Sequence, residues 1–105
     1  MYIVTFRIAN KTLDGLSYQD RYDALDTELK AKAKTDGLWY DTTSFFVVGS
    51  DENTYSFGER LVQHLNSKHD MLFGFDPEDM SAFYFGNIDA PEVLTHFFPR
   101  AKKLE

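Results

Sequence analysis

The apolar residues of this chain change their spacing early, and this change most limits the folds that the chain can adopt. Over residues 2–8 every second side chain is apolar on one face, which is the pattern of a strand with one side against a core. That face comprises Tyr2, Val4, Phe6 and Ile8. From residue 18 the apolar side chains recur at steps of three and four. We therefore expect a strand followed by an amphipathic helix, each with one apolar side.

The expected helix has a defined start and stop. Its apolar stripe comprises Tyr18, Tyr22, Leu25, Leu29 and Ala33. Ser17 is placed as the N-cap, with its hydroxyl ready to accept a hydrogen bond from the amide near Asp20. The Asp20 carboxylate suits the positive end of the helix dipole, and Gly37 is a natural stop.

The rest of the chain predicts short strands, two further helices and a turn. Residues 38–40 and 44–48 are expected to form a β-hairpin or one bulged strand, and residues 71–75 and 82–85 two further strands. A helix is expected from a Ser56–Glu59 capping box to about residue 65, and a short helix from Pro91 to His96. Residues 76–79 are expected to form a capped turn. The order β-α-β-β-α-β with an extra strand predicts an α+β, ferredoxin-like fold with two helices on one face of an antiparallel sheet. Residues 1–100 are expected to form this single domain, and residues 101–105 a polar C-terminal tail that frays.

Composition narrows the class of protein. A length of 105 residues suits one domain, and the ten Phe, six Tyr and one Trp can fill its core. The lack of cysteine excludes disulfides, thiolate zinc sites and a cysteine nucleophile. The net charge of −6, from 17 acidic and 11 basic residues, argues against binding to nucleic acid or anionic membranes. No apolar run approaches about 18 residues, so we expect a soluble, cytoplasmic protein.

Residue types that carry out chemistry are present but are not grouped in motifs. Asp20, Asp23 and Asp26 are three residues apart on the first helix, so they drift around it by about 60° per step and cannot meet at one ion. The three histidines lack the paired spacing that binds a metal. No nucleophile elbow or glycine-rich phosphate loop is present. We therefore expect no catalytic residue, no metal site and no cofactor.

The aromatic residues are the most unusual feature of the chain, and they cluster. They allow three interpretations: core packing, a protein–protein or dimer surface, and a platform for nucleobases, the last disfavoured by the acidic residues around them. The candidate binding residues are Trp39, Tyr40, Phe45, Phe46, Tyr84, Phe85, Phe97 and Phe98. The segment of residues 93–99 is apolar for the end of a chain, so it either packs over the open face of the sheet or is exchanged with a partner.

Several segments together resemble a known family. They are the strand of residues 1–6, Gly37-Leu38-Trp39, residues 44–48 and residues 70–73. Over about residues 1–86 the chain resembles the small ferredoxin-like proteins that include the CRISPR-associated "Cas two" nucleases, the VapD toxins and the SinR-like proteins. The resemblance implies homodimers formed through the sheets and, in some members, metal-dependent cleavage of RNA or DNA. Their metal-binding Asp at the end of the first strand corresponds here to Arg7, which cannot ligate a cation.

Three functions remain open on these grounds. The leading hypothesis is a small non-catalytic protein-binding or regulatory module, of the inhibitor or adaptor type, that acts as a homodimer and binds a protein partner of unknown identity. One alternative is a metal-dependent endonuclease of the resembled family, in which Asp14 replaces the missing carboxylate and Mg or Mn is the cofactor. The other is an acidic mimic of nucleic acid, which the interspersed Lys and Arg residues weaken.

Overall fold

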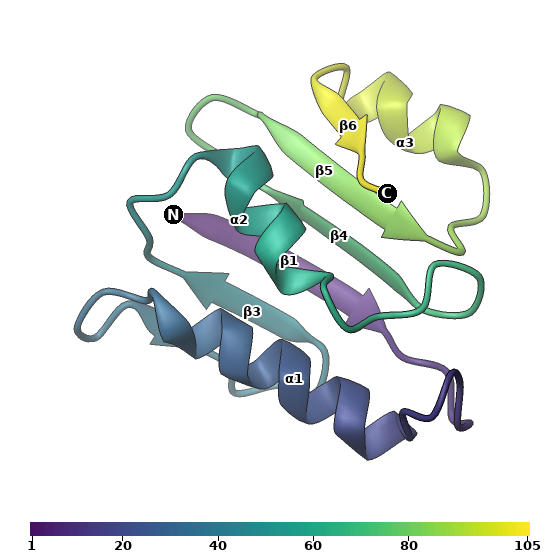
Figure 1. The fold of residues 1–105 in the computed structure, drawn as a ribbon. Coiled ribbons are helices and arrows are strands. Elements are labelled where there is room, and N and C mark those ends of the chain that lie inside the picture. Colours follow the sequence, from purple (N-terminus) through teal and green to yellow (C-terminus); the bar gives the residue numbers. More distant parts are fainter.

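The first strand of the chain lies in the middle of an open sheet. In the computed structural model, which describes residues 1–105, six strands have the order β2-β3-β1-β4-β5-β6 (Figure 1). They are β1 (Tyr2–Arg7), β2 (Leu38–Trp39), β3 (Phe45–Val48), β4 (Met71–Phe75), β5 (Ala82–Gly86) and β6 (Ala101–Lys103). The helices are α1 (Tyr18–Ala31), α2 (Thr54–Leu61) and α3 (Pro91–Phe97). Neighbouring strands are antiparallel except β5 and β6, and the fold is of the mixed α+β class.

The alternation in the first strand defines the core as predicted. Tyr2, Val4, Phe6 and Ile8 are all buried. Val4 pairs with Phe46 of β3 on one side and with Gly74 of β4 on the other, so these positions share one face of the sheet. Helices α1 and α2 cover this inner face with Leu25, Leu29, Phe57 and Leu61. Of the predicted stripe, Leu25 and Leu29 are buried and Tyr22 packs against the core, whereas Tyr18 is 37% exposed. The helix ends at Ala31, before Ala33 and before the predicted stop at Gly37.

The predicted helix cap and hairpin are confirmed. Ser17 Oγ accepts a hydrogen bond from the Asp20 amide at 3.0 Å, and the Asp20 carboxylate accepts one from the Ser17 amide at 2.9 Å. Strands β2 and β3 form the antiparallel hairpin, with Trp39 opposite Val47. The hydrogen bonds from Ser17 lower the pKa of the Asp20 carboxyl, so the cap is charged at neutral pH.

The second helix begins and ends earlier than predicted. Asn53, not Ser56, is its N-cap, because the Asn53 side chain accepts hydrogen bonds from the amides of Tyr55 and Ser56. The helix ends at Leu61, and residues that were expected to continue it to about position 65 form turns. The capping-box prediction for Ser56 and Glu59 is therefore wrong.

The end of the chain is ordered. Residues 101–103 form β6 beside β5, and the amide of Leu104 donates to the carbonyl oxygen of Tyr84 at 2.8 Å. Leu104 is 6% exposed and belongs to the core, where it packs near Gly58 of α2. The expectation that this segment frays is wrong, because parallel pairing with β5 directs its one large apolar side chain inward.

The opposite face of the sheet, here named the outer face, is covered in part by α3. Its positions follow from the strand register: Ile3, Thr5, Arg7, Trp39, Phe45, Val47, Met71, Phe73, Phe75, Ala82 and Tyr84. The predicted short helix at Pro91 is confirmed as α3. None of the three helices is long and apolar enough to cross a membrane.

Candidate functional site

The outer face carries a row of aromatic side chains that the helices leave partly open. Trp39 of β2 and Phe45 of β3 pack edge to face, with ring centroids 6.2 Å apart. They remain 49% and 37% exposed, respectively. Further along the sheet, the Phe73 and Phe75 rings of β4 stack with centroids 5.7 Å apart. The uncovered side of the sheet is therefore apolar and aromatic, and it lies over β2, β3 and β1.

The segment after α3 covers the part of the outer face that β4 forms. The Phe98 ring packs on Phe73 and Phe75, with centroid distances of 4.9 and 5.0 Å. In this structure of one chain, the apolar end of the sequence folds back over its own sheet. Phe97, the neighbour of Phe98, is 68% exposed and borders a groove that Phe73 also lines.

A groove of about 390 Å³ separates α3 from the sheet. Its floor is formed by Thr5 of β1 and by Met71 and Phe73 of β4. Val93, Leu94 and Phe97 form the α3 side, and the one charged residue in the lining is Asp89. We name this the α3 groove. A concave, apolar surface next to exposed aromatic rings is suited to contact with another apolar surface.

The eight candidate binding residues divide into three groups. Trp39, Phe45, Tyr84, Phe97 and Phe98 lie on the outer face or on the segment that covers it. Phe46 and Phe85 are only 2% and 4% exposed and belong to the core, so their assignment to a binding surface is wrong. Tyr40 is exposed but lies on the helix side, where it stacks on Phe46 with centroids 5.9 Å apart and Lys30 Nζ is 5.3 Å from its ring.

Asp14, the residue invoked for a nuclease, lies in an exposed turn. Its Oδ2 accepts a hydrogen bond from Asn66 Nδ2 at 3.3 Å. Arg7, at the end of β1, donates instead to the carbonyl oxygen of Asn87 at 3.0 Å. No group of three His, Asp or Glu side chains in residues 1–105 is placed to hold a metal ion.

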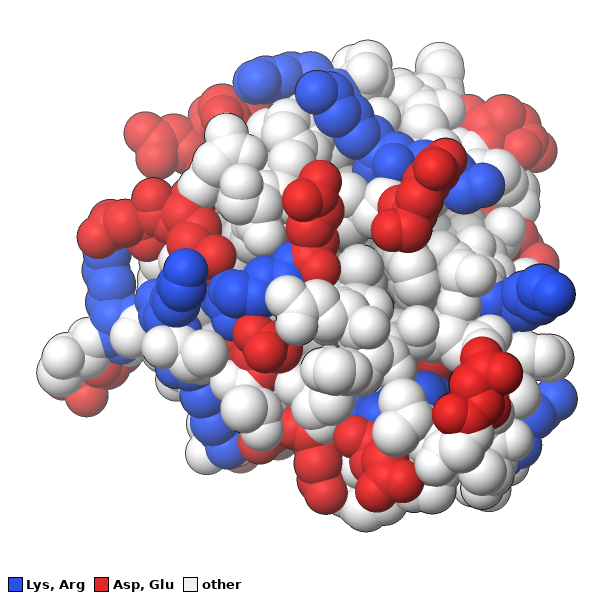
Figure 2. All heavy atoms as spheres, viewed as in Figure 1, with Lys and Arg blue, Asp and Glu red and all other residues white.

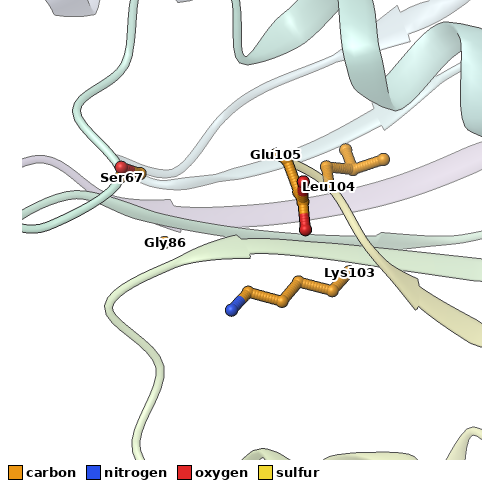
Figure 3. Close-up of a pocket in the computed structure, with 5 residues that line it drawn as sticks. All are labelled: Ser67, Gly86, Lys103, Leu104 and Glu105. Atoms are coloured by element: carbon orange, nitrogen blue, oxygen red, sulfur yellow. The ribbon is translucent and has the colours of Figure 1, made fainter.

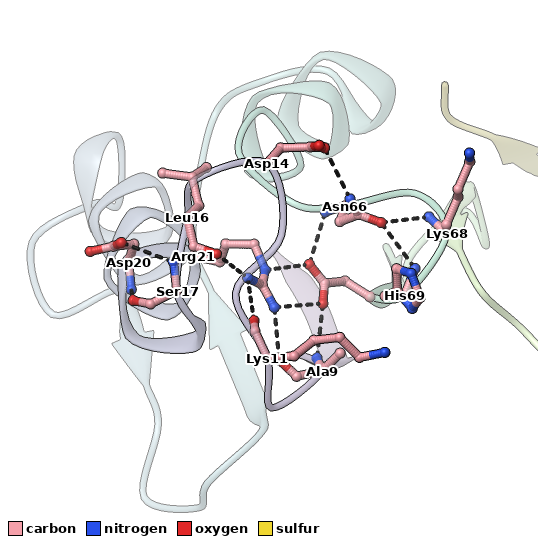
Figure 4. Close-up of polar contacts among 11 residues, drawn as sticks. Ala9, Lys11, Asp14, Leu16, Ser17, Asp20, Arg21, Asn66, Lys68 and His69 are labelled. Atoms are coloured by element: carbon pink, nitrogen blue, oxygen red, sulfur yellow. Dashed lines mark hydrogen bonds and ion pairs between the residues drawn. The ribbon is translucent and has the colours of Figure 1, made fainter.

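A buried ion pair holds the loop that contains Asp14, and the sequence analysis missed it. Arg21 of α1 and Asp70 before β4 are 1% and 0% exposed, with Arg21 Nε 2.8 Å from Asp70 Oδ2. Figure 4 shows Arg21 among the loop residues that it contacts. The Arg21 guanidinium also donates to the carbonyl oxygens of Ala9, Lys11 and Leu16 at 2.7, 3.0 and 2.6 Å. Position 21 falls three residues after Tyr18 and four before Leu25, so its place on the apolar stripe was the available signal.

A second polar cluster lies at the start of β1. Ser81 Oγ is 2.6 Å from both Thr54 Oγ1 and Asp79 Oδ1, and the Ser81 hydrogen bonds lower the pKa of the Asp79 carboxyl. Burial raises the pKa of the Tyr2 hydroxyl nearby. Ser81 is 2% exposed, so its hydroxyl cannot be reached by a substrate and serves to order the turn between β4 and β5.

A small pocket near the C-terminus is a weaker candidate. It has a volume of about 270 Å³ and is lined by Ser67, Gly86, Lys103, Leu104 and Glu105 (Figure 3). One amine, one carboxylate and one hydroxyl border it, and all three belong to exposed residues at its rim. None of these polar groups is buried, so the pocket has no enclosed polar group that would fix the orientation of a ligand.

Comparison with known proteins found no match, whether to a family model, to a curated protein or to a solved structure.

Proposed function

We propose that this chain is a small non-catalytic binding module that acts as a homodimer and uses the outer face of its sheet as the contact surface. The observation that carries this proposal is the uncovered aromatic half of that face, where Trp39 and Phe45 are 49% and 37% exposed. Burying such side chains stabilises an assembly by about 25 cal/mol for each Å² of apolar surface removed from water. The dimer then presents its remaining polar surface to a protein partner.

The distribution of charge supports the outer face over the helix-covered face. Figure 2, which has the view of Figure 1, shows acidic and basic side chains interspersed across the face that α1 and α2 cover. Among the outer-face positions of strands β1 to β5, Arg7 is the one charged residue. Interface cores are depleted of charge, so the outer face is the better contact surface. The mixed charges of the other face do not favour an acidic mimic of nucleic acid.

We also propose that the fold is ferredoxin-like at the finer level and that the resemblance to the "Cas two", VapD and SinR-like family reflects a shared architecture. The order β2-β3-β1-β4, antiparallel throughout, supports this proposal, as does the position of α1 and α2 on one face. Strands β5 and β6 then extend this four-stranded unit at one edge.

Analytical ultracentrifugation tests the dimer. We expect wild-type protein to be dimeric at about 100 μM and Phe45→Ser to raise the dissociation constant at least about 10-fold, the effect of losing one buried aromatic contact. The matched control is Tyr18→Ser, because Tyr18 is also 37% exposed but lies on α1, on the other side of the sheet. A wild-type monomer at 100 μM, or equal weakening by both variants, would contradict the proposal.

A further inference from the structure

We propose that the contact between two copies is reciprocal: the Phe97 ring of each copy inserts into the α3 groove of the other. Such a contact presupposes the homodimer proposed above and identifies what holds it. A two-fold dimer requires one surface to be complementary to itself. Phe97 and the α3 groove provide a protruding group and a recess on the same side of one molecule.

Phe97 has the properties of an inserting group. At 68% it is the most exposed of the large apolar side chains, and it borders the groove at the end of α3. A Phe side chain buries about 150–250 Å² when fully covered, and aromatic side chains are common at the centres of interfaces. The chain itself leaves most of this area in water, so a second copy can gain it.

The groove has room for such a ring. Its volume is about 390 Å³, and its floor of Thr5, Met71 and Phe73 is mainly apolar. An apolar cavity of about 150 Å³ is enough to hold a benzene ring. One phenyl group therefore fits with space left for the rearrangement of Val93 and Leu94 around it.

The charges at the border of the groove are complementary under a two-fold axis. Asp89 lines the groove, and Arg7 projects from the outer face at the end of β1. Neither side chain forms an ion pair within the chain. Both residues lie at the same end of the sheet, since Arg7 donates to the carbonyl oxygen of Asn87, two residues before Asp89. A two-fold axis that passes near this end and near the α3 groove therefore brings Arg7 of one copy toward Asp89 of the other, which orients the contact.

The small area of the open part of the sheet indicates that α3 takes part in the contact between the two copies. The three open strands, β1, β2 and β3, have two to six residues each. At about 4.8 Å between strands and about 3.3 Å per residue they cover roughly 200 Å². Specific interfaces bury about 600 Å² or more from each partner. The open part of the sheet alone is thus too small, and the contact has to extend over α3, where Phe97 and Val93 are 68% and 52% exposed.

Two variants separate the ring from the groove. Phe97→Ala removes the ring, which also widens the groove on its α3 side, but keeps the apolar floor of the groove. Thr5→Trp fills the groove and leaves the ring. Each variant alone loses both reciprocal contacts, so we expect its dissociation constant to rise about 100-fold, or about 10-fold for each contact. An equimolar mixture restores one contact, and native mass spectrometry should show a heterodimer about 10-fold tighter than either variant homodimer.

Glu92→Ala is the control, because Glu92 is exposed on α3 and does not line the groove. His96 is unsuitable, since its ring packs on that of Phe97 with centroids 5.4 Å apart. Circular dichroism checks that each variant is folded, and Val93→Trp replaces Thr5→Trp if the latter is not. A heterodimer no tighter than the two homodimers would overturn the reciprocal contact. If Phe45→Ser dissociates the dimer while Phe97→Ala does not, the ring contact is wrong and the homodimer stands; a monomeric wild type removes both.

Discussion

Asp70 is the residue at which three segments of the chain meet. Its carboxylate accepts hydrogen bonds from the amides of Ala9 and Asn66, each at 2.8 Å, in addition to the ion pair with Arg21. These contacts join the loop after β1, helix α1 and the turn before β4 (Figure 4). Every polar atom of the pair has a partner, so its burial is compensated.

Removing both charges of this pair should cost less than the sum of the costs of removing each charge alone. Asp70→Asn leaves the Arg21 cation buried without a counter-ion, and we expect the free energy of unfolding to fall by about 3–5 kcal/mol. Arg21→Met should have a similar cost. The double variant leaves no unpaired charge, so its loss should be smaller than the sum of the two single losses by at least about 1 kcal/mol in urea unfolding. Additive losses would show that the two groups are not coupled.

Glu52 should make the free energy of unfolding depend on pH. Arg60 donates to both of its carboxylate oxygens, at 2.6 and 3.0 Å, and these hydrogen bonds lower the pKa of the Glu52 carboxyl. Because the pKa of Glu52 is lowered in the folded state, its contribution to the free energy of unfolding is fully present above the ordinary glutamate pKa, about 4.3. That contribution is lost as the pH falls through the folded-state pKa. Glu52→Gln should therefore destabilise the protein by about 1–2 kcal/mol at pH 7 and by much less near pH 2.

Asp51, the residue before Glu52, provides the control for this dependence of stability on pH. Asp51 pairs with Lys34 at the surface, where the two side chains are 87% and 58% exposed. Such a pair contributes little, so Asp51→Asn should leave the dependence of the melting temperature on pH close to that of the wild type. Equal effects of the two substitutions would assign the pH dependence to net charge and not to Arg60.

At the scale of the elements, Gly58 is the point where α2 packs tightly against the sheet. A Cβ atom at Gly58 would lie 2.7 Å from Phe83 Cγ of β5 and 2.9 Å from Leu104 Cδ1. Both neighbours belong to the core, with Phe83 0% exposed, so they have little room to move. The absence of a side chain is what allows the helix and the end of the chain to share this space.

Gly58→Ala should destabilise the protein even though alanine is the better helix former. The gain in helix propensity is about 0.5–1 kcal/mol, whereas overpacking a core costs about 1–3 kcal/mol. We therefore expect a net loss of about 1 kcal/mol or more in chemical denaturation. Ser56→Ala, at an exposed position of the same helix, should be neutral or slightly stabilising. A stabilised Gly58→Ala variant would mean that Phe83 and Leu104 yield to the methyl group.

At the scale of the whole molecule, the sequence predicts the elements better than the surfaces they form. The alternation of β1 and the stripe of α1 identify the core side, because each pattern has a clear polar side. Residues 45–48 are apolar without alternation, so the face of Phe46 could not be read and depends on its register with Val4. The burial of Leu104 depends likewise on a strand pairing that no local pattern indicates.

The sequence predicted only part of the candidate site, because the rest of the site depends on how distant strands pair. Clustering of aromatic residues indicated a surface, and Trp39, Phe45 and Phe97 do lie exposed. The α3 groove could not be predicted, since it is formed by β1, β4 and α3, which are distant in sequence and meet only once the sheet is assembled. Arg21 was missed because a charged residue on an apolar stripe is usually solvated at its tip, and here loop carbonyls replace the water.

The central position of β1 also has a consequence for how the chain reaches its fold. Its hydrogen bonds go to residues 45–48 on one side and to residues 71–75 on the other, so no neighbour in the sequence can pair with it. Each of these pairings closes a long loop, and the entropy of closure has to be lost before the pairing contributes any stability. Non-local pairing of this kind is associated with slower folding than that of helical proteins whose contacts are local. The first strand to be completed in the sequence is thus among the last to find both of its partners.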